Sequence, residues 1–341
     1  VKMDYERRLE KKMIFFITVL RALAACLITN AHYTGIYPIE IIANGGLIGD
    51  VLFFAVSGYC LYNVKYELSP KGFALWYGKR LWRVYPPVIL MTLIYMLAGY
   101  YSLKEQDVFW WYVYPTYYHF VASIIILYIP FFFTMKIEKV KRHLTAVMFL
   151  VALVGLGVYI FWYDKTTYHI DTVREPYIRF LFFESMLLGA WFRKNDYRFR
   201  NIFQWRLVGG GAISFVIYFV SKILFSGGHL DPVFQIVNQV AIFVLLYYLF
   251  RLFAAIDWNL THSSGWVKKL IEFLSGLTLE IYVVQYVLIE IIRNLGLPFP
   301  FNWIVLTAAI VLFAFVLKSV CDLIYKTIDR LLEKIAKRER V

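Results

Sequence analysis

The sequence predicts an all-α, polytopic membrane protein with about ten transmembrane helices and both termini in the cytoplasm. Of its 341 residues, 61% are hydrophobic, 20% are aromatic and only 17% are charged, which is far from the balance of a soluble domain. Apolar runs of roughly 17 to 25 residues, the length that crosses a hydrocarbon core about 30 Å thick, recur along the chain. The expected spans are residues 13–33, 45–64, 84–100, 117–134, 144–163, 177–192, 206–225, 233–254, 272–294 and 301–325.

Loops this short predict a single integral-membrane domain over residues 1–341. Residues 1–12 form a cytoplasmic N-terminus, 13–325 the helical bundle and 326–341 a cytoplasmic tail. The tail is expected to be an amphipathic helix lying on anionic headgroups, because one apolar stripe is surrounded by basic residues. The alternative is a plain polar tail.

The net charge of +13 follows the expected topology and does not indicate a nucleic-acid partner. If the N-terminus is cytoplasmic, 29 of the 36 Lys and Arg residues fall in inside segments. This asymmetry is the positive-inside rule, and it places both termini in the cytoplasm. The first apolar run has full span length and no small-residue cleavage motif follows it, so we expect it to remain in the protein.

The cysteines and histidines do not indicate a metal site. Cys26, Cys60 and Cys321 are scattered through apolar helices, so we expect small buried hydrophobic residues and no disulfide framework. The six histidines lack HExxH or a comparable ligand spacing. We therefore expect no metal.

The segment DVFWWYVYPTYYH, residues 107–119, is dense in Trp and Tyr. One interpretation is an aromatic belt where the fourth helix enters the bilayer. The other is an external surface on which sugar rings stack, since aromatic faces pair with the apolar faces of carbohydrates. The sequence leaves both open.

The stretch RALAACLITNAH, residues 21–32, carries an arginine and a histidine at the ends of an apolar helix. Eleven residues at about 100° each bring Arg21 and His32 onto one face, roughly 16 Å apart along the axis. They are too far apart for a hydrogen-bonded pair. The predicted orientation puts Arg21 at mid-depth and His32 near the outer surface.

Arginine in mid-bilayer is costly unless it faces a partner, the bundle interior or a wet cavity. An interhelical salt bridge from Arg21 to Glu184 or Glu280 is one explanation, and lining a substrate path is the other. His32 is either an interfacial residue or a general base. Asp50, at the outer end of the second helix, is a candidate to orient its imidazole.

Arg80 and Arg83 lie one turn apart at the cytoplasmic approach to the third helix. Such a fork suits phosphates, although positive-inside charge in contact with headgroups also explains it. In series with Arg21 and His32, the pair suggests a long phosphorylated carrier threaded inward from the cytoplasm. An acyl-CoA fits this order, with His32 taking the proton of an acceptor hydroxyl.

Three motifs together resemble the acyltransferase-3 family of bacterial membrane O-acyltransferases. They are RALAACLITNAH, the following LFFAVSGY and the later RLWRVYP. The resemblance covers nearly the whole chain and implies ten helices in the bacterial cytoplasmic membrane. It also implies an acyl-CoA co-substrate, most often acetyl-CoA, and a hydroxyl acceptor on a surface polysaccharide or glycolipid. We expect the form that lacks a fused hydrolase-like domain, so a separate extracytoplasmic transferase is a possible partner besides membrane lipids.

The resemblance implies that Arg21 and His32 are needed for activity and that Arg80 and Arg83 correspond to the R-x-x-R pair of the family motif. Ser57 and Tyr59 belong to the SGY element, for which it implies helix packing or cavity lining.

Three positions depart from the family pattern or add to it. Asp50 lies one residue earlier than the acid of many members, a turn of about 100° on a helix, which puts its pairing with His32 in doubt. The segment LTLEIYVVQ, which contains Tyr282, ends in Gln285 where relatives often have histidine. His119 falls where relatives often carry a histidine and is either near the acceptor or a satisfied interfacial residue.

The alternative function is a transporter or exporter of a glycan or lipid-linked precursor. In that case Arg21 and Glu184 or Glu280 line a pathway and the Arg80–Arg83 pair is not needed. The chain lacks paired Gly/Pro-broken helices in its two halves, which speaks against a transporter with inverted repeats.

Overall fold

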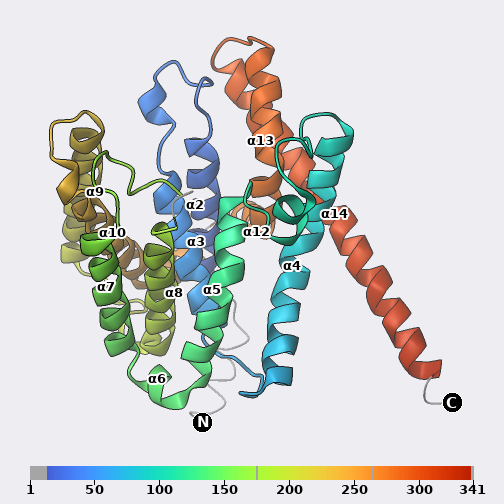
Figure 1. Cartoon of the computed structure of the whole chain (residues 1–341), viewed down its shortest axis with the longest axis horizontal. Helices are drawn as coiled ribbons and strands as arrows, with labels where there is room; N and C mark the ends of the chain where they lie inside the picture. The colour runs from blue at the N-terminus through green and yellow to red at the C-terminus, as the bar shows by residue number, and fades with distance from the viewer. Residues whose placement is uncertain (1–13, 174–175, 263, 339–341) are drawn as a thin grey trace. The chain divides into compact units, whose positions relative to one another are not determined.

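The computed structural model describes residues 14–173, 176–262 and 264–338, and the secondary structure of that part is helical (Figure 1). The predicted N-terminal segment 1–12 and the last three residues of the tail lie outside the described residues. The main helices are α2 (Phe15–Ala31), α3 (Gly46–Leu61), α4 (Pro70–Leu97), α5 (His119–Lys136), α7 (Leu144–Phe161), α8 (Ile178–Lys194), α9 (Trp205–Ser226), α10 (Ile236–Ala255), α12 (Gly265–Gly276), α13 (Thr278–Asn294) and α14 (Phe301–Arg338). The shorter elements are η1 (Glu40–Ile42), the π-helix η2 (Phe109–Val113), α6 (Glu138–Arg142), η3 (Asp196–Arg198), η4 (Pro232–Phe234) and α11 (Asp257–Thr261).

Each expected span coincides with a helix, and the all-α fold class is confirmed. Six helical segments in the described part are long and apolar enough to cross a membrane, or up to seven if α12 and α13, bent by 71°, form one span. Helix α2 is also apolar but shorter, with 17 residues. The count of ten spans and the cytoplasmic placement of both termini stay predictions.

Two helices are longer than expected. Helix α4 begins at Pro70, well before the expected start at residue 84, and it continues through Pro86 and Pro87. Arg80 and Arg83 therefore lie inside a continuous helix. Helix α14 runs without a break into the predicted amphipathic tail, as Figure 1 shows in red.

The chain divides into two compact units. The first comprises Val1–Ile28, Gly45–Tyr77 and Ser123–Ser275, and the second comprises Thr29–Asn44, Gly78–Ala122 and Gly276–Val341. Four of the boundaries fall inside helices, namely α2, α4, α5 and α12, and the fifth falls just before α3. The expected single integral-membrane domain over residues 1–341 stays a prediction.

The first unit is built around the contact between α3 and α8. A Cβ on Gly58 of α3 would lie 1.9 Å from the carbonyl oxygen of Met186, and one on Gly189 of α8 would lie 1.8 Å from that of Ala55. Glycine allows this approach because it has no side chain, as is common where membrane helices pack. Of the two roles expected for the SGY element, helix packing or cavity lining, Gly58 has the first.

Helices α7 and α9 of the first unit are mostly exposed, since only 17% of the apolar stretch of each helix is buried. Such helices suit contact with lipid, because their backbone groups are satisfied internally and their side chains are apolar. Helix α3, by contrast, is buried over most of its length.

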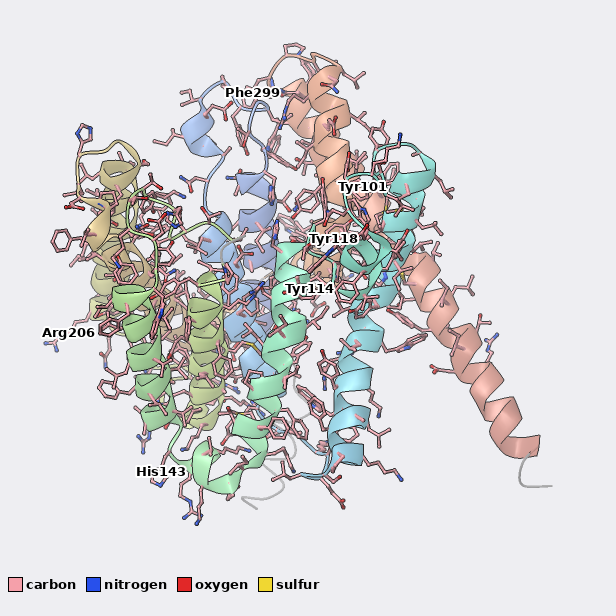
Figure 2. The ribbon with its side chains drawn as sticks, viewed as in Figure 1. Tyr101, Tyr114, Tyr118, His143, Arg206 and Phe299 are labelled. Carbon is pink, nitrogen blue, oxygen red and sulfur yellow. The ribbon has the colours of Figure 1, made fainter. Side chains whose placement is uncertain are left out.

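The second unit contains a dense set of aromatic rings contributed by α4, the segment after it, and α13. The Tyr101 and Tyr118 hydroxyl groups are 3.4 Å apart (Figure 2). Tyr95 donates to the Val284 carbonyl of α13 at 2.7 Å. Trp111 and Tyr118 are fully buried. The segment 107–119 is thus partly core, and neither the belt nor the sugar-stacking interpretation describes these two rings.

Candidate active site

His32 follows directly after α2 in the second unit and is half-buried. Its ring meets that of Tyr286 edge to face, with centroids 5.0 Å apart and planes at 67°. Tyr117 and Tyr118 also contact Tyr286, with centroid distances of 5.6 and 5.8 Å. The structure therefore brings His32 and the segment around residue 118 to the same ring of α13.

The imidazole of His32 is held by ring packing. Within the second unit neither ring nitrogen makes a hydrogen bond to a described residue. A histidine in this state keeps a lone pair and an N–H available for a ligand, which is what general base catalysis requires. The predicted pairing with Asp50, a buried residue of α3 in the first unit, stays a prediction.

His119 begins α5 and is half-buried, one residue after Tyr118. Tyr282 lies one turn before Tyr286 on α13, and its hydroxyl accepts a hydrogen bond from the Phe120 backbone N–H at 3.2 Å. Tyr282 therefore ties α13 to the start of α5. Its role in this geometry is to position the rings near His32.

Gln285 is fully buried next to Tyr286, and within the second unit neither Nε2 nor Oε1 of its amide has a hydrogen-bond partner. Buried amides are nearly always paired, because each unsatisfied group costs about 1–3 kcal/mol. An amide left in this state offers both a donor and an acceptor to a ligand. This feature appears only in the folded structure, whereas the sequence marked Gln285 only as a departure from histidine.

Arg21 lies on α2 in the first unit and is half-buried. Its Nη2 lies 3.6 Å from Cys60 Sγ on α3, a weak acceptor. Of the two explanations for Arg21, the salt bridge to Glu184 is not formed among the described residues of the first unit, where Arg21 contacts Cys60 and Glu184 Oε1 is buried without a partner. The arginine therefore keeps donors for an anionic ligand. A pairing with Glu280, in the second unit, stays a prediction.

The expectation that the cysteines are small buried residues is confirmed for one of the three. Cys321 is buried, but Cys26 and Cys60 are exposed as free thiols. The error arose because apolar neighbours in sequence do not reveal which face of a helix is covered.

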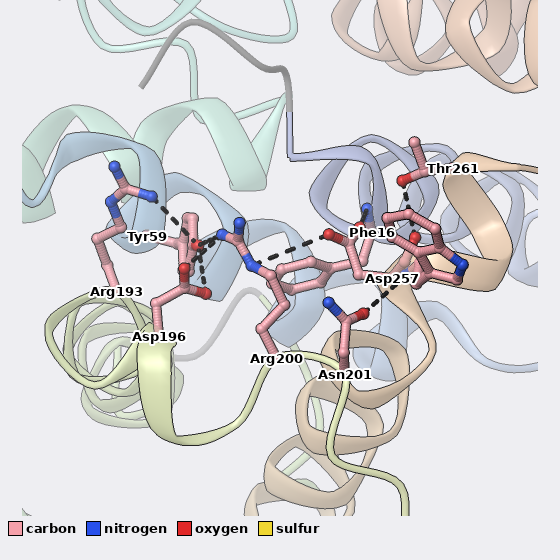
Figure 3. Close-up of polar contacts among 9 residues, drawn as sticks. Phe16, Tyr59, Arg193, Asp196, Arg200, Asn201, Asp257 and Thr261 are labelled. Atoms are coloured by element: carbon pink, nitrogen blue, oxygen red, sulfur yellow. Dashed lines mark hydrogen bonds and ion pairs between the residues drawn. The ribbon is translucent and has the colours of Figure 1, made fainter. Parts of the chain in front are cut away.

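A polar cluster in the first unit fixes the start of α2 (Figure 3). Asp257 Oδ1 accepts the backbone N–H of Phe16 at 2.8 Å and so satisfies a donor in the first turn of the helix. Arg200 forms a salt bridge with Asp196 and lies 3.9 Å from Asp257 Oδ2. Figure 3 shows the Arg200 side chain between these two carboxylates.

Tyr59 of the SGY element joins this cluster. Its hydroxyl donates to Asp196 Oδ1 at 3.0 Å and accepts from Arg193 and Arg200 at 3.4 Å. Two guanidinium groups face two carboxylates, so the cluster is balanced in charge and acts as a clamp, not as an anion site. Ser57, two residues earlier, is half-buried. The clamp was not predicted from the sequence, where its only local signal is the Asp196–Arg200 spacing of four residues.

Arg80 and Arg83 lie on the part of α4 that belongs to the second unit. Arg80 is half-buried and Arg83 is exposed. Three residues apart on a continuous helix, they lie on neighbouring positions of one face. The spacing of the predicted fork is therefore present on one face of α4.

Comparison with known proteins decides the family. The family model described as an acyltransferase domain, of the acyltransferase-3 type, matches residues 14–321. The chain belongs to the acyltransferase-3 family. It is therefore an acyltransferase and, with its several long apolar helices, a multi-pass membrane protein. No curated protein and no solved structure matches it.

For this acyltransferase, we expect Gln285→Met to raise thermal stability and to slow transfer. The thioether replaces two unpaired polar groups by an apolar chain of similar length, and each group costs about 1–3 kcal/mol. The rate of acyl transfer should fall roughly tenfold. An unpaired buried amide lowers stability, and such costly groups occur mainly at functional sites where a ligand hydrogen-bonds to them. The melting temperature in detergent measures the change in stability, and the initial rate of acyl transfer measures the change in activity.

The matched control is Gln239→Met in α10. The Gln239 amide is also buried, but its Nε2 donates to the Ile170 carbonyl at 3.0 Å. This variant should lose stability, because the carbonyl is left without its donor. A loss of stability in Gln285→Met with normal transfer would show that the Gln285 amide is structural.

Proposed function

We propose that the protein transfers an acyl group, acetyl in the first instance, from cytoplasmic acyl-CoA to a hydroxyl of an extracytoplasmic glycan or glycolipid. The observation that carries the proposal is His32. It is half-buried beside Tyr286 with both ring nitrogens uncommitted within its unit, in a chain of the acyltransferase-3 family. Its predicted position near the outer surface supports an external acceptor.

In the proposed reaction His32 takes the proton of the acceptor hydroxyl as its oxygen attacks the thioester carbonyl. A carbon–oxygen bond forms, the carbon–sulfur bond breaks, and the proton on His32 returns to the departing CoA thiolate. The uncommitted amide of Gln285 is suited to donate to the oxyanion that develops on the carbonyl oxygen. Arg21, with donors left over from its weak contact to Cys60, is suited to the carrier path.

Arg80 and Arg83 are proposed to bind the phosphates of CoA. Guanidinium groups form strong, bidentate hydrogen bonds with phosphate, and the predicted topology puts this part of α4 at the cytoplasmic mouth. Removing both groups should therefore weaken donor binding more than it slows chemistry. A separate extracytoplasmic transferase is a proposed partner for acceptors that this chain does not reach.

The test is the cleavage of labelled acetyl-CoA by the purified full chain in detergent, followed by release of the acetyl group. We expect slow cleavage in wild type and a rise in KM of roughly tenfold or more in the Arg80→Ala, Arg83→Ala double variant, because each charge-assisted bond contributes about 1.5–3 kcal/mol. Lys71→Ala is the control, since Lys71 is an exposed cation on the same helix.

An unchanged KM in the double variant would remove the arginine pair from the donor site. Failure of the wild-type protein to bind or cleave any acyl-CoA would overturn the donor assignment. Export of a glycan or lipid-linked precursor would then be the function to test.

A further inference from the structure

A pocket in the first unit lies where α7 ends and α8 begins, apart from His32 in sequence and in unit. Its volume is about 400 Å³, and its lining includes Trp162, Tyr163, Asp164, His169, Tyr177 and Phe180. We call it the Trp162 pocket. The predicted topology puts this loop on the outer side of the membrane.

The loop that forms one wall of the pocket is held in place by Gln235, a fully buried residue. Its Oε1 accepts from the backbone N–H groups of His169 and Ile170, both at 3.0 Å, and its Nε2 donates to the Thr167 carbonyl at 3.1 Å. One side chain thus satisfies three backbone groups of the loop. The pocket is preorganised, which lowers the entropic cost of binding a ligand.

The aromatic rings have separate roles. Tyr163 stacks with His169 at 4.9 Å and with Tyr159 at 5.4 Å, so its ring is fixed by its neighbours. The side chain of Trp162 is 78% exposed. Its indole therefore presents a large apolar face at the rim, which can cover one side of a ligand.

The lining of the Trp162 pocket also provides two hydrogen-bond acceptors, Asp164 and His169. Asp164 Oδ1 accepts from the backbone N–H and the hydroxyl of Thr166, at 2.9 and 2.8 Å, and these bonds hold the pKa of the carboxyl below its usual value. The second carboxylate oxygen makes no hydrogen bond to a described residue. His169 Nδ1 lies 2.9 Å from the Thr167 carbonyl and so donates to it, which leaves Nε2 as an acceptor.

The charges around the pocket favour a neutral ligand. Lys165 Nζ donates to the carbonyls of Tyr159, Ile160 and Tyr163 at 3.0 to 3.1 Å, so it neutralises the C-terminal end of α7 and balances Asp164. The N-terminus of α8, beside the lining residues Tyr177 and Phe180, carries a partial positive charge. A ligand with a full charge of either sign gains little here.

We infer that the Trp162 pocket binds one neutral sugar ring, which stacks on Trp162 and donates hydroxyl hydrogens to Asp164 and His169. An apolar face, several hydroxyl donors and no net charge are the properties that this wall of rings and acceptors complements. The sugar would be a unit of the acceptor glycan, and that part of the inference rests on the proposed function.

The test uses the full chain in a detergent without a sugar headgroup, probed by saturation-transfer NMR with methyl glucoside, methyl galactoside and methyl N-acetylglucosaminide. We expect at least one glycoside to bind, and Trp162→Ala to weaken it roughly tenfold, the effect of losing about 1.4 kcal/mol of stacking. Trp162→Phe should recover most of the affinity. Trp205→Ala is the control, since Trp205 is 80% exposed at the start of α9.

An equal loss of glycoside affinity in Trp162→Ala and Trp205→Ala would overturn the sugar site. So would the absence of binding of any of the three glycosides. A co-purified lipid lost specifically in Trp162→Ala, seen by native mass spectrometry together with absent glycoside binding, would assign the pocket to lipid instead. Cleavage of acetyl-CoA by the same wild-type sample separates the two ideas. If it cleaves the donor but binds no sugar, the pocket assignment fails while the proposed function stands.

Discussion

His32→Ala is expected to lower acyl transfer by about 10²- to 10⁴-fold, the usual contribution of a positioned general base. The imidazole in this structure lies against Tyr286 and keeps both nitrogens uncommitted within its unit, so its removal leaves the acceptor proton without a base. Donor binding should persist, because the proposed phosphate contacts lie on α4. Transfer to the cell-surface glycan, measured by mass analysis, reports the loss.

The control for this change is His143→Ala. His143 is exposed, next to the start of α7 (Figure 2), and belongs to the first unit. The His143→Ala variant should transfer the acyl group at the wild-type rate. Near-normal transfer by His32→Ala, in protein whose melting temperature is unchanged, would show that another group acts as the base.

Gly58→Ala is expected to cause a large loss of stability. The added methyl carbon would lie 1.9 Å from the Met186 carbonyl oxygen, and backbone of a neighbouring helix cannot move aside as a flexible side chain can. We expect a cost of about 2–3 kcal/mol or more, at the upper end of overpacking in a core. Thermal unfolding in detergent and the yield of folded protein measure it.

The matched control is Gly157→Ala in α7, where an added Cβ meets nothing within 4 Å. There alanine should be neutral or stabilise the helix by up to about 1 kcal/mol, since glycine is the poorer helix former. Similar melting temperatures for both variants would mean that α3 and α8 do not approach as closely as described.

The positions of the helices were largely predictable from the sequence. Each expected span overlaps an observed helix, because a run of apolar side chains long enough for a membrane must satisfy its backbone groups internally. The helix boundaries were less predictable. Helix α4 starts at Pro70, well before the apolar span, because mixed polar and apolar residues also form helix and a hydropathy criterion does not detect them. The candidate residues of α2 came from helical spacing together with the family motifs.

The partners of those residues were not predictable. Glu184 was one of the candidate partners for Arg21, yet the structure puts Cys60 beside the guanidinium. Trp111 and Tyr118 were expected at an aromatic surface and are buried instead. In each case the sequence identifies a side chain that needs an environment but does not say which neighbour supplies it: Cys60 of α3 for Arg21, and Tyr101 for Trp111 and Tyr118.

By itself, the sequence determined an all-helical membrane protein, because local composition and hydropathy carry that information, and its motifs resembled the acyltransferase-3 family, which supplied the acyltransferase activity and the candidate roles of Arg21, His32, Arg80 and Arg83. Only the tertiary structure decided that His32 packs on Tyr286, that Asp257 caps α2, that Gln285 is buried without a partner and that α3 and α8 meet at Gly58. The physical reason is that contacts between helices depend on their rotation and approach in space. Neither is encoded in the spacing of residues along a single helix.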